Sequence, residues 1–230
     1  MALFHVVIPA AGTGSRMKSE IPKQYLPLAG RPIIEHALRV FADNPHVHSI
    51  IVVLSPDDEH WNKLEIHTDQ KISVERSGGA SRAETVLNAL KLLKASNEDW
   101  VLVHDAVRPG LSQAALERLI SNLADDPVGG ILAIPLADTL KRANSMNRIA
   151  KTEPRESLWQ AQTPQMFRYG VLNEALLASG GAPTDESQAV EALGLQPKLV
   201  LGEARNFKIT YPQDLQLAEA LWRADAKEGI

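Results

Sequence analysis

Short, continuous apolar runs alternate along the chain with stretches in which apolar residues recur every three or four positions. The continuous runs are typical of strands buried on both faces of a parallel sheet, and the longer period is typical of amphipathic helices. Strands are predicted at residues 6–8, 50–54, 71–75, 100–104, 129–135, 198–201 and 206–210. Helices are predicted at residues 32–41, 81–94, 112–123, 169–178 and 184–193, and a last one is opened by Thr210, Pro212 and Gln213. This order predicts an α/β fold, three-layered and Rossmann-like, with a mostly parallel sheet.

Residues 136–158 break the alternation. Two strand-like runs, 138–142 and 148–152, flank a polar tip at residues 143–147, which predicts a projecting β-hairpin arm. Both faces of this hairpin are mostly polar, and a lone two-stranded hairpin is only marginally stable in water. We therefore expect residues 1–230 to form a single domain from which residues 136–158 project as a dimerisation arm, exchanged with a second subunit in a homodimer.

Composition narrows the class of protein. The 230 residues suffice for one α/β domain with a sizeable core, and no polar or Pro/Gly/Ser-rich linker divides them. The net charge of −4 argues against broad nucleic-acid binding, and the absence of cysteine excludes disulfides, thiolate catalysis and Cys-ligated zinc. No apolar run reaches the roughly 20 residues of a membrane span, and the first strand leaves no room for a signal segment. We therefore expect a cytoplasmic protein with no membrane or nucleic-acid partner.

The first strand ends in a glycine-rich turn that carries candidate chemistry. Gly12 and Gly14 allow backbone amides to approach a ligand closely. Arg16 and Lys23 follow as two cations, and amides beside cations suit the phosphates of a nucleoside triphosphate. The alternative is a plain strand–turn–helix connection with solvated charges. A dinucleotide fingerprint needs a third glycine, where Met17 stands, and the Gly-Lys-Ser/Thr of a Walker A loop is absent.

Two later segments add to this candidate site. Gly78 and Gly79 form either a strand-to-helix turn or a second backbone wall against a ligand. Asp105 follows the strand at residues 100–104, and in open α/β sheets ligands collect beyond the carboxyl ends of strands. A carboxylate at that position is a natural Mg²⁺ ligand beside substrate phosphates. The alternative is that Asp105 caps a turn and pairs with Arg108.

Seven segments stand in a fixed order: Pro9-Ala10-Ala11-Gly12-x-Gly14-x-Arg16-Met17, Pro22-Lys23-Gln24-Tyr25, Val103-His104-Asp105-Ala106-x-Arg108-Pro109, Asp138-Thr139-Leu140-Lys141, Arg155-x-x-Leu158-Trp159-x-x-Gln162-Thr163-Pro164-Gln165, Thr184-Asp185-Glu186 and Asn206-x-Lys208-Ile209-Thr210. In this order, over nearly the whole chain, they resemble the 2-C-methyl-D-erythritol 4-phosphate cytidylyltransferase family. The resemblance implies transfer of CMP from CTP to methylerythritol phosphate in non-mevalonate isoprenoid biosynthesis, with release of pyrophosphate. It also implies a Rossmann-like homodimer that uses Mg²⁺ or another divalent cation.

The resemblance further implies roles for individual residues. The catalytic set is Arg16, Lys23, Arg155 and Lys208. The CTP-binding set is Ala10, Ala11, Gly12, Gly14, Gly79, Ala80 and Thr85. The set expected to bind methylerythritol phosphate is Asp105, Thr139, Arg155, Thr163, Thr184 and Lys208. Asp105 is also the expected metal ligand, and since Thr139 and Arg155 lie on or beside the arm, we expect them to serve the partner's site in a dimer.

The chain departs from the family pattern at three positions. Many members carry an acid where Ala80 stands and a serine where Thr85 stands. Some carry an acid where Arg205 lies, which leaves Asp105 as the clearest metal ligand. Three other functions stay open: a nucleotidyltransferase acting on another sugar or polyol phosphate, a nicotinamide-dependent oxidoreductase, and a catalytically silent nucleotide-binding module. The missing third glycine speaks against the oxidoreductase, and retention of both loop cations speaks against the silent module.

Overall fold

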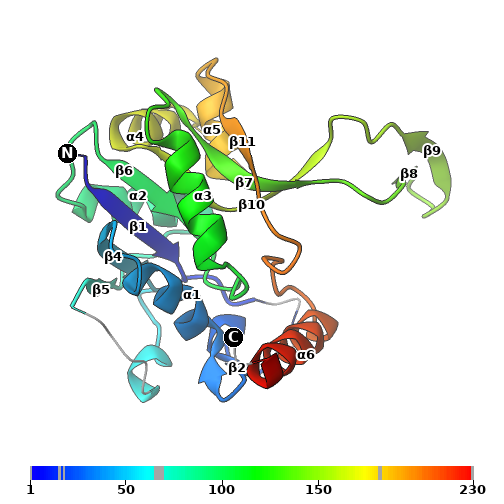
Figure 1. Ribbon diagram of the computed structural model, residues 1–230, viewed down its shortest axis with the longest axis horizontal. Helices are drawn as coiled ribbons and strands as arrows, with labels where there is room; N and C mark the ends of the chain where they lie inside the picture. The colour runs from blue at the N-terminus through cyan, green and yellow to red at the C-terminus, as the bar shows by residue number, and fades with distance from the viewer. Residues whose placement is uncertain (1, 15–16, 18, 65–69, 181–182, 229–230) are drawn as a thin grey trace.

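The computed structural model describes residues 2–14, 17, 19–64, 70–180 and 183–228, and a seven-stranded sheet forms its centre (Figure 1). From one edge to the other the strands are β11 (Lys198–Leu201), β7 (Gly129–Pro135), β10 (Trp159–Arg168), β6 (Trp100–Val103), β1 (Phe4–Pro9), β4 (Val47–Val53) and β5 (Ile72–Glu75). Neighbouring strands are parallel except for β10, which pairs antiparallel with both β6 and β7. The prediction of a mostly parallel sheet is confirmed.

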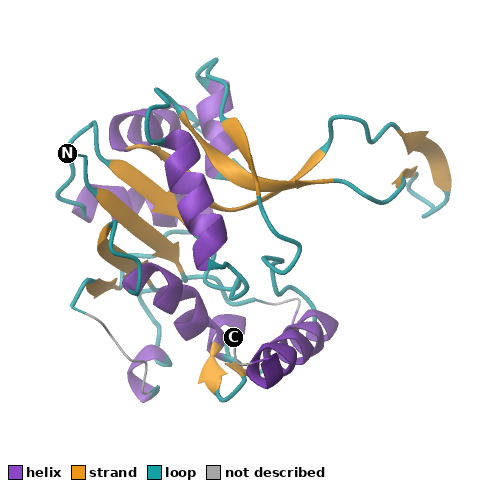
Figure 2. Cartoon of the chain, in the orientation of Figure 1, coloured by secondary structure: helices purple, strands orange, loops and turns teal. Residues whose placement is uncertain are grey.

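Helices cover both faces of this sheet (Figure 2). On one face lie α1 (Ile33–Ala42) and α3 (Gln113–Leu123). On the other face lie α2 (Arg82–Leu92), α4 (Tyr169–Ala178) and α5 (Glu186–Ala192). The central strands β1, β4 and β6 are buried from both sides because each face meets a helical layer, which explains their continuous apolar runs. The three-layered α/β fold is confirmed.

Several short elements lie outside the sheet and its two helical layers. They include the 3₁₀ turns η2 (Lys23–Tyr25) and η3 (Trp61–Lys63) and the two-residue strands β2 (Pro27–Leu28) and β3 (Arg31–Pro32). β2 and β3 pair antiparallel with each other. β2 also contacts the C-terminal helix, and a small hydrophobic cluster, separate from the two main ones, includes Leu28 of β2 and Ala218 of that helix. In the described part of the chain no helix is both long and apolar enough to cross a membrane.

The C-terminal helix α6 (Pro212–Glu228) begins where the sequence predicts. The Asp214 carboxylate accepts hydrogen bonds from the amides of Thr210 (2.8 Å) and Tyr211 (2.8 Å). A side chain of the first helical turn therefore satisfies the amides before the helix. This side chain belongs to Asp214, whereas the sequence pattern predicts Gln213.

Two segments differ from the predicted strands. Residues 159–168 form the antiparallel strand β10, although their pattern predicts none. The prediction of a strand at residues 206–210 is wrong. The Ile209 amide donates to the Val107 carbonyl (2.9 Å), but no ladder forms along these described residues. The Asn206 carbonyl instead accepts from the side chain of Arg108 (2.8 Å), so a side chain takes the place of a neighbouring strand.

The predicted hairpin is present, and it projects from the body beyond β7 and β10 (Figure 1). Its strands β8 (Leu140–Ala143) and β9 (Ile149–Glu153) pair antiparallel with each other and form a sheet separate from the central one. Met146 and Ile149 are 71 % and 69 % exposed, so the hairpin carries apolar surface that its own chain leaves uncovered. In the described part of the chain, the strands of the hairpin pair with each other and with no other strand.

Packing on β10 can be tested with Phe167, which is fully buried in the layer beneath α4 and α5. Phe167→Ala removes a buried ring and leaves a cavity, so we expect the free energy of unfolding to fall by about 3–5 kcal/mol. The control is Leu92→Ala on α2, where the side chain is 49 % exposed and the expected change is below about 0.5 kcal/mol. Urea unfolding at equal protein concentration measures both. Equal losses in the two variants would contradict the place of β10 in the core.

Candidate active site

One cavity gathers most of the residues expected to bind nucleotide. It measures about 460 Å³ and lies beyond the carboxyl ends of β1 and β6, next to the start of α2. Open α/β sheets place ligands at this end of their strands. The predicted site residues in its wall are Ala10, Ala11, Gly12, Gly14, Lys23, Gly79, Ala80, Thr85, Asp105 and Lys208.

The first wall of the cavity is the turn after β1. The Ala10 amide donates to the Val53 carbonyl (2.8 Å), and the chain then turns with Gly14 at φ +70°. A side chain at Gly14 would collide with the aliphatic part of Lys23, so both the backbone angle and the space require glycine there. The stem of Lys23 thus lies against the turn, and its ammonium donates to the Ile209 carbonyl (3.1 Å).

The second wall is the turn before α2. The Thr85 hydroxyl accepts from the Gly79 amide (3.1 Å) and donates to the Ser81 carbonyl (2.9 Å). The Glu84 carboxylate accepts from the Ala80 amide (2.8 Å). The Ser81 hydroxyl in turn caps α2 by accepting from the Glu84 amide (3.1 Å). Side chains of the first turn of α2 therefore fix the loop that precedes this helix. Thr85, an expected CTP-binding residue, shapes this wall of the cavity.

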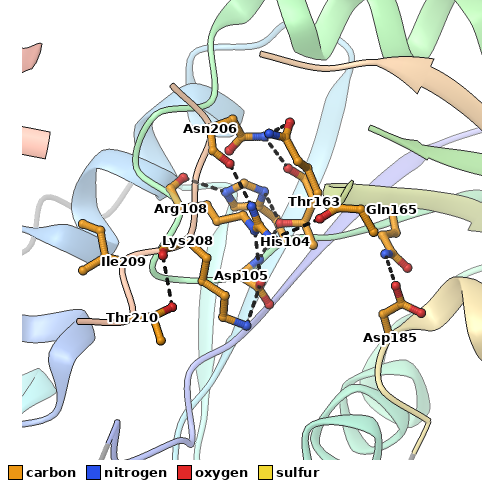
Figure 3. Close-up of polar contacts among 12 residues, drawn as sticks. His104, Asp105, Arg108, Thr163, Gln165, Asp185, Asn206, Lys208, Ile209 and Thr210 are labelled. Atoms are coloured by element: carbon orange, nitrogen blue, oxygen red, sulfur yellow. Dashed lines mark hydrogen bonds and ion pairs between the residues drawn. The ribbon is translucent and has the colours of Figure 1, made fainter. Parts of the chain in front are cut away.

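Asp105, two residues beyond β6, is surrounded by cations, and Figure 3 shows Arg108 and Lys208 beside it. Its carboxylate is contacted by Arg82 Nε (3.0 Å), Arg108 Nε (3.2 Å) and Lys208 Nζ (3.0 Å). Burial by itself would raise the pKa of this carboxyl group, but the charges of Arg82, Lys208 and Arg108 outweigh burial and hold its pKa well below the ordinary value. Asp105 is therefore ionised at neutral pH. Asp105 therefore pairs with Arg108, as one of the two alternatives predicts, and it also lies in the cavity wall.

A buried network fixes the backbone of Asp105 (Figure 3). The Thr163 hydroxyl accepts from the Asp105 amide (3.1 Å) and donates to His104 Nδ1 (3.0 Å). The other ring nitrogen of His104 faces the Arg108 carbonyl (3.1 Å), which can only accept, so the proton of the ring is on Nε2. Burial lowers the pKa of His104 to about 4, and the ring is neutral. Thr163 is absent from the cavity wall and supports Asp105 from the neighbouring strand.

Arg82 and Glu186 belong to the candidate site, although neither is predicted from the sequence. Arg82 lies in the first turn of α2 and contacts both Asp105 (3.0 Å) and Glu186 (2.7 Å). Glu186, the first residue of α5, is 1 % exposed, and burial raises the pKa of its carboxyl group against the opposing charge of Arg82. The two residues are 104 positions apart, so no local spacing reveals the pair. The one available signal was the place of Glu186 in the motif at residues 184–186.

Comparison with known proteins assigns a family to this geometry. The family model of 2-C-methyl-D-erythritol 4-phosphate cytidylyltransferase (IspD) matches residues 4–224. The chain belongs to this family. Among curated relatives, the cytidylyltransferase of that name from Nitrosomonas eutropha is 55 % identical over 231 residues, covering 98 % of this chain and 99 % of the relative. The one from Nitrosospira multiformis is 53 % identical, covering 96 % of this chain and 98 % of the relative.

Solved structures agree with the family assignment. A crystal structure of a 4-diphosphocytidyl-2C-methyl-D-erythritol synthase has a TM-score of 0.86 and 42 % identity, covering 96 % of this chain and 99 % of the other. The 2-C-methyl-D-erythritol 4-phosphate cytidylyltransferase of Thermus thermophilus has a TM-score of 0.79 and 34 % identity, covering 97 % of this chain and 100 % of the other. The family and fold predicted from the sequence are confirmed. The chain is a cytidylyltransferase, and hence a nucleotidyltransferase, of isoprenoid biosynthesis.

Arg16, a predicted catalytic residue of this cytidylyltransferase, lies outside the described residues. Among the residues that the structure describes, Thr139, Arg155 and Thr184 are absent from the cavity wall. Thr139 and Arg155 are exposed and flank the hairpin, one before β8 and one after β9. Thr184 is exposed two residues before α5, where its amide and hydroxyl both donate to the side chain of Gln188 (2.6 and 3.1 Å). One chain therefore brings the predicted CTP-binding residues together in one cavity and leaves Thr139 and Arg155 apart from it.

The fit of a metal ion depends on Asp105. Among the described residues in the cavity wall, Asp105 is the one that carries a carboxylate. Arg205, which stands where some relatives carry an acid, pairs with Asp225 on α6. Within the described ranges no three His, Asp or Glu side chains are grouped so as to hold a metal. Because Mg²⁺ is often held by one carboxylate together with substrate phosphates and water, Asp105 fits an ion that arrives with a triphosphate.

The Arg82–Glu186 pair can be tested by its effect on stability. Arg82→Met leaves Glu186 buried without its partner, so we expect the free energy of unfolding to fall by about 3–5 kcal/mol. Adding Glu186→Gln removes the unpaired charge, and the double variant is expected to be more stable than Arg82→Met alone. Urea unfolding of the two single variants and the double variant measures the coupling.

The control for this cycle is Arg223→Met, which breaks an exposed pair with Glu219 on α6. Its expected cost is below about 1 kcal/mol, since exposed pairs contribute little. Losses from Arg82→Met and Glu186→Gln that simply add in the double variant would contradict a direct interaction.

Proposed function

We propose that this cytidylyltransferase transfers CMP from CTP to 2-C-methyl-D-erythritol 4-phosphate, giving 4-diphosphocytidyl-2-C-methyl-D-erythritol and pyrophosphate. The main support is one cavity in which two backbone walls, Lys23 and Lys208 surround Asp105. Amides and fixed cations suit a triphosphate, and the family supplies the identity of the base and of the acceptor. A cytoplasmic location, without a membrane or nucleic-acid partner, stays a prediction from composition.

The reaction needs no side-chain nucleophile. The phosphate of methylerythritol phosphate is already anionic, and one of its oxygens attacks the α-phosphorus of CTP. The new P–O bond forms in line with the bond that breaks, and pyrophosphate leaves with that electron pair. The barrier lies in bringing two anions together and in spreading negative charge over the phosphoryl oxygens. Cations that are in place beforehand lower this barrier without rearranging during the reaction.

Lys23 and Lys208 come from distant parts of the chain but meet around one segment. Lys23 contacts the carbonyl of Ile209, the residue that follows Lys208. Lys208 in turn contacts Asp105 Oδ2 (3.0 Å). We assign Lys23 to the triphosphate and Lys208 to the attacking phosphate. Arg16 joins Lys23 on the strength of the family motif.

Mg²⁺ or another divalent cation is the proposed cofactor. Asp105 would hold it together with phosphate oxygens of CTP. When bound, such an ion offsets the charge of the triphosphate and polarises its phosphoryl oxygens. The contribution of this chain is to keep Asp105 ionised and oriented, through Arg82, Arg108 and the Thr163 hydroxyl.

Pyrophosphate release is the direct test of the proposed function. We expect release only when CTP and methylerythritol phosphate are both present with Mg²⁺, and none when ATP, GTP or UTP replaces CTP. Lys23→Ala and Lys208→Ala are each expected to lower kcat/KM by about 10²–10³-fold, the typical loss for one transition-state contact. Arg223→Ala, exposed on α6, serves as the control.

Other results of this assay have distinct meanings. Release with another nucleotide or another phosphate would keep the reaction type and overturn the substrate assignment. Absence of release from folded protein that still binds CTP would favour a silent nucleotide-binding module.

We further infer that two chains exchange arms in a homodimer. Thr139 and Arg155 lie on the arm, just outside its two paired strands, and outside the cavity of their own chain. The arm projects away from the body (Figure 1), and its exposed Met146 and Ile149 provide apolar surface for a partner. A partner chain would support the hairpin and receive the arm residues at its own cavity.

Mixing two inactive variants tests this exchange. Lys23→Ala damages the cavity wall, and Arg155→Ala damages the arm. If each arm completes the partner's site, a mixed dimer has one intact site, so co-expression of both variants is expected to restore roughly a quarter of wild-type activity. Differently tagged chains allow mixed dimers to be purified and their pyrophosphate release measured. Mixed dimers without activity would contradict the exchange.

A further inference from the structure

A buried glutamine shapes the glycine-rich turn, and it is not among the residues assigned a role above. Gln24 is 4 % exposed and lies in the 3₁₀ turn η2. Its side-chain Nε2 donates to the carbonyl oxygens of Ala10 (2.8 Å) and Gly12 (3.2 Å). A glutamine amide has two N–H donors on that nitrogen, so one side chain holds two loop carbonyls.

Because peptides are planar, this contact also orients the loop amides. In a trans peptide the C=O of one residue and the N–H of the next point in opposite directions. Since the carbonyls of Ala10 and Gly12 point at Gln24, the amides of Ala11 and Thr13 point away from it. Within the described structure neither amide donates to a protein acceptor, and both residues line the cavity. The two amides are therefore available to a ligand.

The turn that carries Gln24 is itself anchored. Its neighbour Tyr25 is 2 % exposed and donates from its hydroxyl to Asp58 Oδ2 (2.7 Å). The other oxygen of Asp58 accepts from the amides of His60 (3.0 Å) and Trp61 (2.9 Å). Gln24 thus stands on a fixed element, whereas the loop it holds contains two glycines and has large conformational freedom of its own.

We propose that Gln24 is a positioning residue for the nucleotide, which aims the amides of Ala11 and Thr13 at acceptor oxygens of bound CTP. This inference rests on the proposed function, because it takes a nucleoside triphosphate as the occupant of the cavity. Without the two donors of Gln24, the carbonyls of Ala10 and Gly12 lose their hydrogen-bond partners. The loop then changes conformation so that water can hydrogen-bond to these carbonyls. The amides then leave their orientation, and CTP binding weakens while the acceptor side of the site keeps its geometry.

Gln24→Met tests the proposal, since it keeps the length of the side chain and removes both donors. The matched control is Asn44→Leu, which likewise keeps the size of a buried amide side chain and removes its donors. Asn44 is 1 % exposed and its side-chain Nδ2 also makes two hydrogen bonds, to Gln113 (3.2 Å) and Glu117 (2.7 Å), but these partners lie on α3, outside the cavity wall. Isothermal titration with CTP and Mg²⁺ gives Kd for both variants and the wild type. Turnover assays give KM for methylerythritol phosphate, and thermal unfolding gives Tm.

We expect Gln24→Met to raise Kd for CTP about ten- to a hundredfold, the effect of one or two lost polar contacts. KM for methylerythritol phosphate is expected to stay within about threefold, and Asn44→Leu is expected to leave Kd for CTP unchanged at a similar loss of Tm. Folded Gln24→Met that binds CTP as the wild type does would overturn the inference. Equal weakening of CTP binding by both variants would do the same, because it would indicate a general loss of stability.

A second measurement needs no variant and serves if Gln24→Met does not fold. In the wild type, the backbone amide resonances of Ala11 and Thr13 are expected to shift on titration with CTP and Mg²⁺. CTP binding without a shift at either amide would overturn the inference while leaving the proposed function intact. Failure of the wild type to bind CTP would overturn the proposed function and this inference with it.

Discussion

The cavity depends on one buried carboxylate. Asp105 at the end of β6 accepts from Arg82 on α2, from Arg108 and from Lys208, and these contacts join segments that are far apart in the sequence. Without this carboxylate, three cations would face one another with no negative charge between them, and like charges at such short range repel one another. Their repulsion would separate α2 from the segment that carries Lys208. The shape of the cavity is therefore a consequence of charge balance as much as of packing.

That balance leaves positive charge facing the cavity. Glu186 offsets part of the charge of Arg82, and Asp105 is shared among three cations, so the cations exceed the carboxylates in this cluster. An anionic substrate supplies the missing negative charge. Because the cations already have partners within the protein, their positions are set before the substrate arrives, and little reorganisation accompanies the reaction. Electrostatic preorganisation of this kind is the main resource available to an enzyme whose reaction has no side-chain nucleophile.

The sequence predicted the elements that are stabilised by local contacts or by burial of apolar side chains alone. The run at residues 50–54 has few alternatives to a strand covered on both faces. β10 was missed because Gln162 and Gln165 interrupt its apolar pattern, yet both are buried, since they hydrogen-bond to the Glu203 carbonyl (2.9 Å) and to Asp185 (2.9 Å). Partners of this kind are fixed by the tertiary fold and leave no periodic signal in the sequence.

The loops of the candidate site could be predicted from the sequence, but the residues that hold those loops in place could not. The glycines and cations of the first turn could be recognised because their chemistry is visible in the residue types. Arg82 could not, since its meaning depends on Glu186, which α5 brings from 104 positions away. Gln24 is closer in sequence to its partners, but its contacts depend on how a glycine-rich turn folds back onto η2. Sequence motifs therefore indicate which groups can touch a ligand, whereas the residues that orient those groups emerge from the fold.

The two halves of the site differ in how they are held. The half proposed to bind the nucleotide has both walls fixed from within one chain, by Gln24 on one side and by Thr85 and Glu84 on the other. The arm residues have no such support, because the strands of the hairpin pair only with each other among the described strands. A rigid half suits the substrate on which charge must be stabilised in the transition state. If two chains exchange their arms as proposed, a partner would set the position of the other half, and the completeness of each site would then depend on assembly.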